Sequence, residues 1–187
     1  MPAVTFPLRT ERLELRPFLD DDFDVLYAMQ SHLEVTRYLY WGPRSPDQVR
    51  EMLERIKPMT AFDDSGDAIR LAAVVIETGA VVGDISLRRT SQEYGQGEIG
   101  FVVHPDHQGR GYATEASAAV LDLGFGELGL HRIVGRADAK NLASARVMER
   151  LGMRREALLR ENEFIKGEWS DEVVYAILAD EWRGRVG

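Results

Sequence analysis

The chain has 187 residues, of which 44% are hydrophobic and 29% are charged, and its formal net charge is −8. This length and composition suit one well-cored globular domain over residues 1–187. The acidic balance argues against general nucleic-acid binding, which normally needs a basic face. Because cysteine is absent, disulfides, thiolate metal sites and cysteine nucleophiles are excluded.

The sequence gives no signal for a membrane. No segment approaches the roughly 18 consecutive apolar residues of a membrane helix. Arg9 and Glu11 come before any long apolar run, so no signal peptide is predicted. We therefore expect a cytoplasmic protein.

The first half of the chain alternates strand and helix patterns. Residues 12–17 alternate at a period of two and predict a strand. Asp20 to Asp22 can cap the helix that follows them. Ser45 and Pro46 open another helix, and its apolar face carries Val49, Met52, Leu53 and Ile56.

The second half continues this alternation without a linker or an internal repeat. Strands are expected over residues 71–77, 81–89, 98–103, 131–137, 155–164 and 172–178. Helices are expected from about Tyr112 onward and over residues 143–151. These elements predict one α/β domain built around a mixed, mainly antiparallel sheet.

The most informative segment joins a predicted strand to a predicted helix through residues 108–113, Gln-Gly-Arg-Gly-Tyr-Ala. Gly109 and Gly111 lack side-chain bulk, so the backbone can approach an anion closely. The following helix directs its unpaired N–H groups and positive dipole end into the same space. This arrangement predicts a phosphate site. The lysine motif of a P-loop is absent, and a Rossmann site would need three spaced glycines in a parallel βαβ unit.

The loop resembles the cofactor motif of the GNAT family of N-acetyltransferases, Gln/Arg-x-x-Gly-x-Gly/Ala. The resemblance runs from about residue 9 to residue 182 and is closest to the Rim-type branch, the ribosomal-protein N-terminal acetyltransferases and their relatives. The segments that carry it are residues 8–16 (LRTERLELR), 98–101 (EIGF), 141–144 (NLAS), 151–153 (LGM) and 167–171 (GEWSD). It implies a single-domain α/β GNAT fold, with helices flanking a twisted sheet whose central strand pair splays apart.

The resemblance also implies a donor site for acetyl-CoA, with no metal. Loop and helix amides would bind the diphosphate, helped by the side chains of Gln108 and Arg110, although Arg110 can equally be a solvated cation. The splayed strand edge would pair with the pantetheine arm. The cofactor-binding residues are then expected to be Phe101, Val102, Val103, Gln108, Gly109, Arg110, Gly111, Tyr112, Ala113, Thr114, Asn141 and Ser144. Asn141 is also a good helix cap by its position alone.

Two glutamates compete for the role of general base, which must take a proton from the attacking amine. Glu98 matches the base of the histone-acetylating relatives, whereas Glu163 matches the glutamate of Rim-type enzymes and is preferred. The serine matching Ser144 is placed in that branch to protonate the departing thiolate. His104 and His107 have the spacing of a metal pair, but a capping or solvent-facing role is favoured. Trp41 can line an acceptor pocket or cover the core.

The expected function is acetyl transfer from acetyl-CoA to a primary amine, either a protein N-terminus or a small molecule, by direct attack in a ternary complex. Without cysteine, and without an activated serine, an acyl-enzyme is not expected. The alternatives are a larger acyl donor such as succinyl-CoA, or a CoA-binding sensor that has lost turnover. No nucleic-acid or membrane partner is expected, and a homodimer is one arrangement that the sequence allows.

Overall fold

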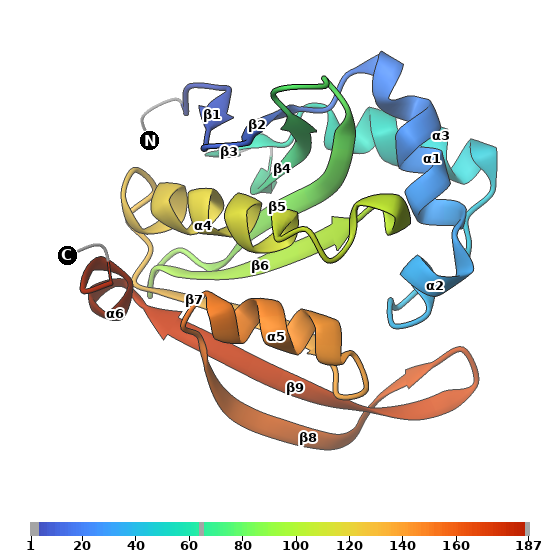
Figure 1. The fold of residues 1–187 in the computed structure, drawn as a ribbon. Helices are drawn as coiled ribbons and strands as arrows, with labels where there is room; N and C mark the ends of the chain where they lie inside the picture. The colour runs from blue at the N-terminus through green and yellow to red at the C-terminus, as the bar shows by residue number, and fades with distance from the viewer. Residues whose placement is uncertain (1–3, 64–65, 186–187) are drawn as a thin grey trace.

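The computed structural model describes residues 4–63 and 66–185, which form a twisted sheet with helices on both faces (Figure 1). The strands are β1 (Leu8–Arg9), β2 (Leu13–Pro17), β3 (Thr60–Asp63), β4 (Gly66–Val75), β5 (Val81–Ser91), β6 (Gln96–Val103), β7 (Arg132–Asp138), β8 (Arg154–Ile165) and β9 (Glu168–Leu178). The helices are α1 (Phe23–Ser31), α2 (Leu33–Thr36), α3 (Pro46–Ile56), α4 (Tyr112–Phe125), α5 (Leu142–Arg150) and α6 (Ala179–Arg183). Short 3₁₀ turns, η1 (Asp20–Asp22) and η2 (Pro105–His107), precede α1 and α4.

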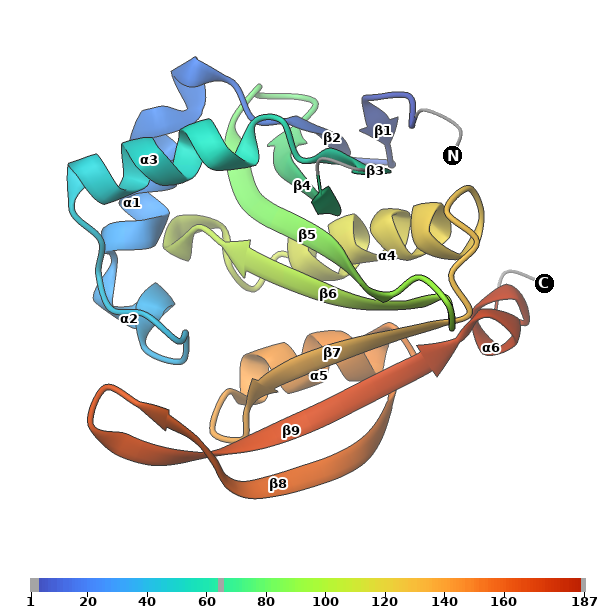
Figure 2. The same ribbon diagram turned by 180° about the vertical axis from the view of Figure 1, so that it is seen from behind.

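The sheet has the strand order β1-β2-β4-β5-β6-β7-β9-β8, and β3 pairs with β4 beside β2. All of these pairings are antiparallel except the central one, between β6 and β7. That parallel pairing ends at Ile99 and Gly135, although both strands continue beyond it. Figure 2 shows the two strands diverging toward the side that carries α2. The predicted mixed, mainly antiparallel sheet with a splayed central pair is therefore confirmed.

The sheet separates two hydrophobic cores, one on each of its faces. On one face, Leu71, Ile85 and Ile133 pack with residues of α4, α5 and α6. On the opposite face, Ala72 and Val74 pack with α1 and α3. Consecutive residues of β4 thus enter different cores, as the period of two requires. The same alternation along β6 decides which of its side chains face α4 and which face the opposite side of the sheet.

Local signals in the sequence explain the helix starts. The hydroxyl of Ser45 accepts from the Gln48 amide, the Gln48 side chain accepts from the Ser45 amide, and Pro46 opens α3. The predicted capping of the first helix by Asp20 to Asp22 is not seen as a side-chain bond. Asp22 is the N-cap residue of α1, but its side chain makes no capping hydrogen bond to that helix. Its buried carboxylate instead pairs with Arg16 at 2.7 Å and accepts from the Leu19 amide. None of the described helices combines the length and apolar character needed to cross a lipid bilayer.

Candidate active site

A first cavity, which we call the donor cavity, lies between the end of β6, the loop before α4, and helices α4 and α5. Its volume is about 310 Å³. Gly111 is the N-cap of α4 with φ +84°, and Gly109 has φ +75°, so both occupy backbone conformations that favour glycine. The first bond of the helix runs from the Glu115 amide to the Gly111 carbonyl, so the amides of residues 112–114 have no partner within the helix.

Two polar side chains on the wall of the donor cavity have a buried atom without a hydrogen-bond partner among the described residues. These atoms are the hydroxyl oxygen of Thr114 and Nδ1 of His107. Burial, followed by the nearby Arg110 charge, lowers the pKa of His107, so its ring is neutral at neutral pH. His104 caps the short turn before the loop, since its Nδ1 accepts from the Asp106 amide at 3.3 Å. Buried polar atoms usually bind a partner, so this wall suits a polar ligand.

The two predicted side-chain contacts of the loop differ. Gln108 lines the donor cavity, and its Nε2 donates to the Val103 carbonyl at 3.1 Å. The guanidinium of Arg110 turns back and donates to the Asp106 carbonyl at 3.1 Å. Arg110 is not among the residues that line the cavity. Its side chain is exposed and braces the loop, whereas the sequence analysis had weighed a diphosphate contact against a solvated cation.

Two cations of the donor cavity were missed by the sequence reasoning. Arg146 and Arg150 lie one turn apart on α5 and line the cavity opposite the glycine loop. No carboxylate lines this cavity among the described residues. The sequence could have indicated this pair of cations. The helix over residues 143–151 was predicted, and two arginines four residues apart lie on the same face of a helix.

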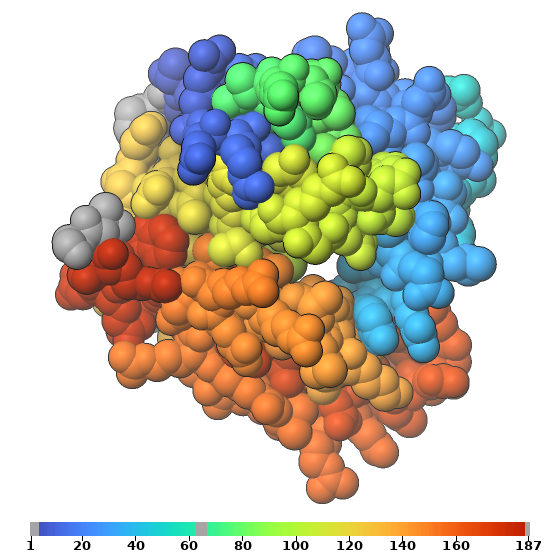
Figure 3. Space-filling view, in the orientation of Figure 1, coloured from blue at the N-terminus to red at the C-terminus, as the bar shows by residue number. Residues whose placement is uncertain are grey.

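The strand residues predicted to hold the donor are divided between two cavities. Phe101 and Val103 line the donor cavity, whereas Val102 lines a second cavity on the other side of the sheet. Phe101 lines both, because it lies where β6 has already separated from β7. The second cavity, which we call the acceptor cavity, has a volume of about 270 Å³. Figure 3 shows the surface hollowed between the loop before α4, the start of α5 and the segment after α2.

Ser144 also joins the two cavities. Asn141 caps α5, and its Oδ1 accepts from the Ser144 amide at 3.1 Å. This bond holds the first turn of α5 in place. Ser144, in that turn, lines both the donor and the acceptor cavity. Asn141 lines the acceptor cavity.

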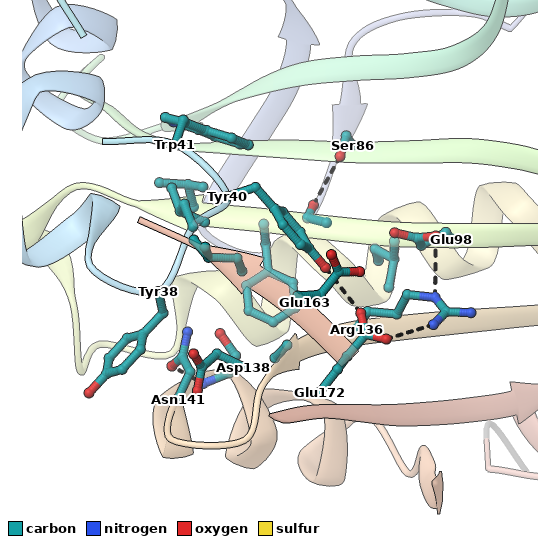
Figure 4. Close-up of a pocket in the computed structure, with 18 of the residues that line it drawn as sticks. Tyr38, Tyr40, Trp41, Ser86, Glu98, Arg136, Asp138, Asn141, Glu163 and Glu172 are labelled. Carbon is teal, nitrogen blue, oxygen red and sulfur yellow. Dashed lines mark hydrogen bonds and ion pairs between the residues drawn. The ribbon is translucent and has the colours of Figure 1, made fainter. Parts of the chain in front are cut away.

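The acceptor cavity is acidic. Both candidate bases, Glu98 on β6 and Glu163 on β8, line it (Figure 4). Its described lining carries six carboxylates and two guanidiniums, namely Asp84, Glu98, Asp138, Glu163, Asp171 and Glu172 against Arg70 and Arg136. A cavity with this excess of negative charge attracts cations.

The two glutamates have different partners. Oε2 of Glu98 accepts from Arg88 at 2.9 Å and lies 3.7 Å from Nε of Arg136, so guanidiniums of two strands engage it. Glu163 is half-buried, and its described side-chain hydrogen-bond partner is Nδ2 of the neighbouring Asn162, at 3.4 Å. Glu163 is therefore the freer of the two to accept a proton.

A third glutamate, Glu172 on β9, organises the acceptor cavity. It is 3% exposed, and its carboxylate accepts from the hydroxyl of Tyr40 at 3.0 Å, from Arg136 at 2.9 Å and from Asn162 at 3.2 Å. Burial, followed by the charge of Glu172, raises the pKa of Tyr40 far above its usual value. Figure 4 shows the Tyr40 hydroxyl directed toward Glu163 and Glu172. This network joins the segment after α2 to β7, β8 and β9.

The floor of the acceptor cavity is formed by β4, β5 and β6. Asp84 is 3% exposed, and its carboxylate accepts from Nε of Arg70 at 2.8 Å. Burial alone would lower the pKa of Arg70, but the Asp84 charge outweighs it and raises that pKa. A Cβ placed on Gly100 would lie 2.8 Å from the Ser86 hydroxyl, so glycine keeps this floor open. Trp41 lines the wall and donates to the buried Gln30 at 3.0 Å.

Comparison with known proteins agrees with this geometry. Residues 12–154 match the family described as the acetyltransferase (GNAT) domain. The chain is 35% identical over 178 residues to the N-acetyltransferase p20 of Bacillus licheniformis, covering 95% of this chain and 98% of that protein. A GNAT-family acetyltransferase structure from Bacillus anthracis has a TM-score of 0.84 and 31% identity, covering 94% of this chain and 100% of that one.

A more distant structure shares the fold. Spermidine N-acetyltransferase from Vibrio cholerae, solved in complex with CoA and spermine, has a TM-score of 0.79 and 22% identity. The match covers 93% of this chain and 99% of that one. The family match and the relatives above 30% identity establish that this chain belongs to the GNAT family and is an N-acetyltransferase.

Proposed function

We propose that the protein transfers acetyl from acetyl-CoA to the primary amine of a cationic acceptor, by direct attack while both substrates are bound. The observation that carries this proposal is the pairing of two cavities of opposite charge that meet at Phe101 and Ser144. The anionic donor suits the basic cavity, and an ammonium acceptor suits the acidic one. The reacting atoms would meet where the strands separate.

The donor cavity fits the diphosphate of acetyl-CoA. Helix amides at the start of α4 and the cations Arg146 and Arg150 would share its charge. The unpartnered Thr114 hydroxyl supplies a further donor. Phe101 and Val103 present the edge of β6 beyond its pairing with β7, where an extended amide-bearing arm can add by strand-like hydrogen bonds.

The protein side chains then move two protons. Glu163 accepts a proton from the ammonium group, which leaves a neutral amine able to attack the thioester carbonyl. The carbon–nitrogen bond forms and the carbon–sulfur bond breaks. Ser144, at the junction of the cavities, donates a proton to the departing thiolate and regains one from the acylated nitrogen. The products are the amide, the free thiol of CoA and one proton held by Glu163, which passes to solvent.

The charge of the acceptor cavity favours an acceptor with more than one positive charge. Polyamines fit this description, and spermine, a polyamine, is bound with CoA in the Vibrio cholerae structure. A basic peptide N-terminus is the other candidate, and the Rim-type segment over residues 8–16 supports it. A panel with spermidine, an aminoglycoside, a basic peptide and the same peptide with a blocked N-terminus separates them by thiol release. Tight binding of acetyl-CoA without transfer to any amine would favour a CoA sensor.

The donor site is tested by replacing Gly111 with valine. A valine at φ +84° distorts the loop and obstructs the approach of the diphosphate, so acetyl-CoA binding should disappear in calorimetry. Gly79→Val is the matched control, since Gly79 has φ +70° in the turn between β4 and β5, away from the donor cavity. Parent-like affinity in Gly111→Val would show that this loop does not hold the donor.

A further inference from the structure

A polar cluster ties the start of β2 to the first turn of α4. Oε1 of Glu115 accepts from the Thr10 hydroxyl at 2.6 Å and from the Arg12 amide at 2.9 Å. Oε2 accepts from Nε of Arg12 at 2.7 Å. The Glu115 side chain is 18% exposed, so its carboxylate is mostly removed from water and held by these donors. In Figure 3 the dark blue N-terminal segment lies against the yellow surface of α4.

The same guanidinium also touches the donor loop. Nη1 of Arg12 donates to the Arg110 carbonyl at 3.1 Å, and the guanidinium carbon lies 4.9 Å from the centre of the Tyr112 ring. A Cβ on Gly111 would lie 3.4 Å from Nη2. Arg12 therefore flanks three consecutive residues where the loop meets α4, yet it is not among the residues that line the donor cavity.

The bond to the Arg110 carbonyl has a geometric consequence. In a trans peptide, the C=O and the N–H of the same unit point in opposite directions. With its C=O held toward Arg12, the peptide between Arg110 and Gly111 points its N–H away from Arg12. Gly111 lines the donor cavity and Arg12 does not, so an N–H that points away from Arg12 is available to that cavity. Because glycines flank Arg110, peptides here can rotate at little steric cost, so an outside contact must select one orientation.

We propose that Arg12 is a positioning residue for the donor: it fixes the peptide before Gly111 so that this amide faces the diphosphate, and it neutralises Glu115 beside the same helix end. This inference rests on the proposed function, in which the loop binds the diphosphate of acetyl-CoA. An unpaired Glu115 would oppose an anion at the positive end of α4. Burial would raise the pKa of Glu115, but bonds from Thr10 and Arg12 outweigh it and keep that pKa low, so the carboxylate stays charged and needs its cation.

The test compares Arg12→Ala with Arg9→Ala. Arg9 lies in the same segment, pairs with Glu14 at 3.0 Å and is 70% exposed, so its removal makes the same charge change without a contact to the loop. The dissociation constant of acetyl-CoA, measured by calorimetry, should rise roughly tenfold or more in Arg12→Ala, the scale of one lost charge-assisted hydrogen bond. In Arg9→Ala it should stay within about twofold, as expected for an exposed pair.

A second acetyl donor distinguishes a loss of loop positioning from a general loss of structure or activity. S-acetylpantetheine lacks the diphosphate, so its kcat/KM should be the same in Arg12→Ala as in the parent. Equal losses for both donors, or equal affinities for acetyl-CoA in the two arginine variants, would overturn the inference. If Arg12→Ala does not fold, Arg12→Lys replaces it: an ammonium keeps the pair with Glu115 but lacks the fork that also reaches Arg110. Parent-like affinity in Arg12→Lys would then overturn the inference.

The outcomes also distinguish this inference from the function on which it rests. If the parent does not bind acetyl-CoA, or Gly111→Val binds it normally, the donor site itself is wrong. If Gly111→Val abolishes binding while Arg12→Ala leaves it unchanged, only the role of Arg12 fails.

Discussion

Replacing Glu163 with glutamine tests which carboxylate of the acceptor cavity takes the proton of the attacking amine. The substitution preserves the shape of the side chain and removes its basicity. Among the described residues, the side chain of Glu163 accepts from the side-chain amide of Asn162 alone, so the change breaks no ion pair within the described part of the chain. General base catalysis contributes about a hundredfold or more, so the acetyl-transfer rate should fall by at least that factor, or about 2.7 kcal/mol in the barrier.

Glu98→Gln, on β6, is the matched comparison for Glu163→Gln, on β8. This change disrupts the ion pairs with Arg88 and Arg136, whose nearest distances are 2.9 and 3.7 Å. Partly exposed pairs contribute at most about 1 kcal/mol, so if Glu98 only positions Arg136 its loss should slow transfer by about fivefold. The two variants should therefore differ by more than a factor of about ten.

The assay is thiol release at saturating acetyl-CoA, repeated from neutral to alkaline pH. The rate lost in Glu163→Gln should shrink as pH rises, because more of the acceptor amine is already neutral. Affinity for acetyl-CoA should stay at the parent value, since Glu163 lines the acceptor cavity and not the donor cavity. A normal rate in Glu163→Gln with a large loss in Glu98→Gln would transfer the role to Glu98. Normal rates in both would mean that solvent removes the proton.

Two further predictions concern the floor of the acceptor cavity. Gly100→Val places a branched side chain against the Ser86 hydroxyl, so steady-state kinetics should show the KM of the acceptor rising roughly tenfold while calorimetry shows unchanged acetyl-CoA affinity; an unchanged KM would mean that the acceptor does not reach this floor. Asp84→Asn leaves the guanidinium of Arg70 without its anion, so urea unfolding should show a free energy of unfolding lower by about 3–5 kcal/mol. A loss below about 1 kcal/mol would show that Arg70 is not held by this pair.

Much of the fold was predictable because its signals are local. The capping residues at Ser45, the glycines at positions 109 and 111, and the period-two pattern of β6 each act within a few residues. The short strands β1 and β3 were not predicted, because two to four residues carry too little periodicity and their pairing with β2 and β4 defines them.

The acceptor cavity was less predictable because distant residues assemble it. Glu172 meets Tyr40 across 132 positions of sequence, and Arg136 across 36. In the sequence Glu172 is simply one polar residue at the start of a predicted strand. Likewise, Asp84 stands in an apolar strand with nothing local to indicate Arg70 as its partner. Tertiary contacts of this kind decide which of several glutamates is buried, paired or free.

The opposite charges of the two cavities also bear on the order in which products leave. Acetylation converts an ammonium group into a neutral amide, so the acceptor loses one positive charge during turnover. Under the proposed function, the carboxylates of the acceptor cavity would then hold the product more weakly than the amine, and inhibition by the acetylated amine should be slight. CoA keeps its phosphates after transfer, so under the proposed function Arg146, Arg150 and the start of α4 would continue to retain it. The amide is therefore expected to dissociate first and CoA last, which makes CoA the stronger product inhibitor.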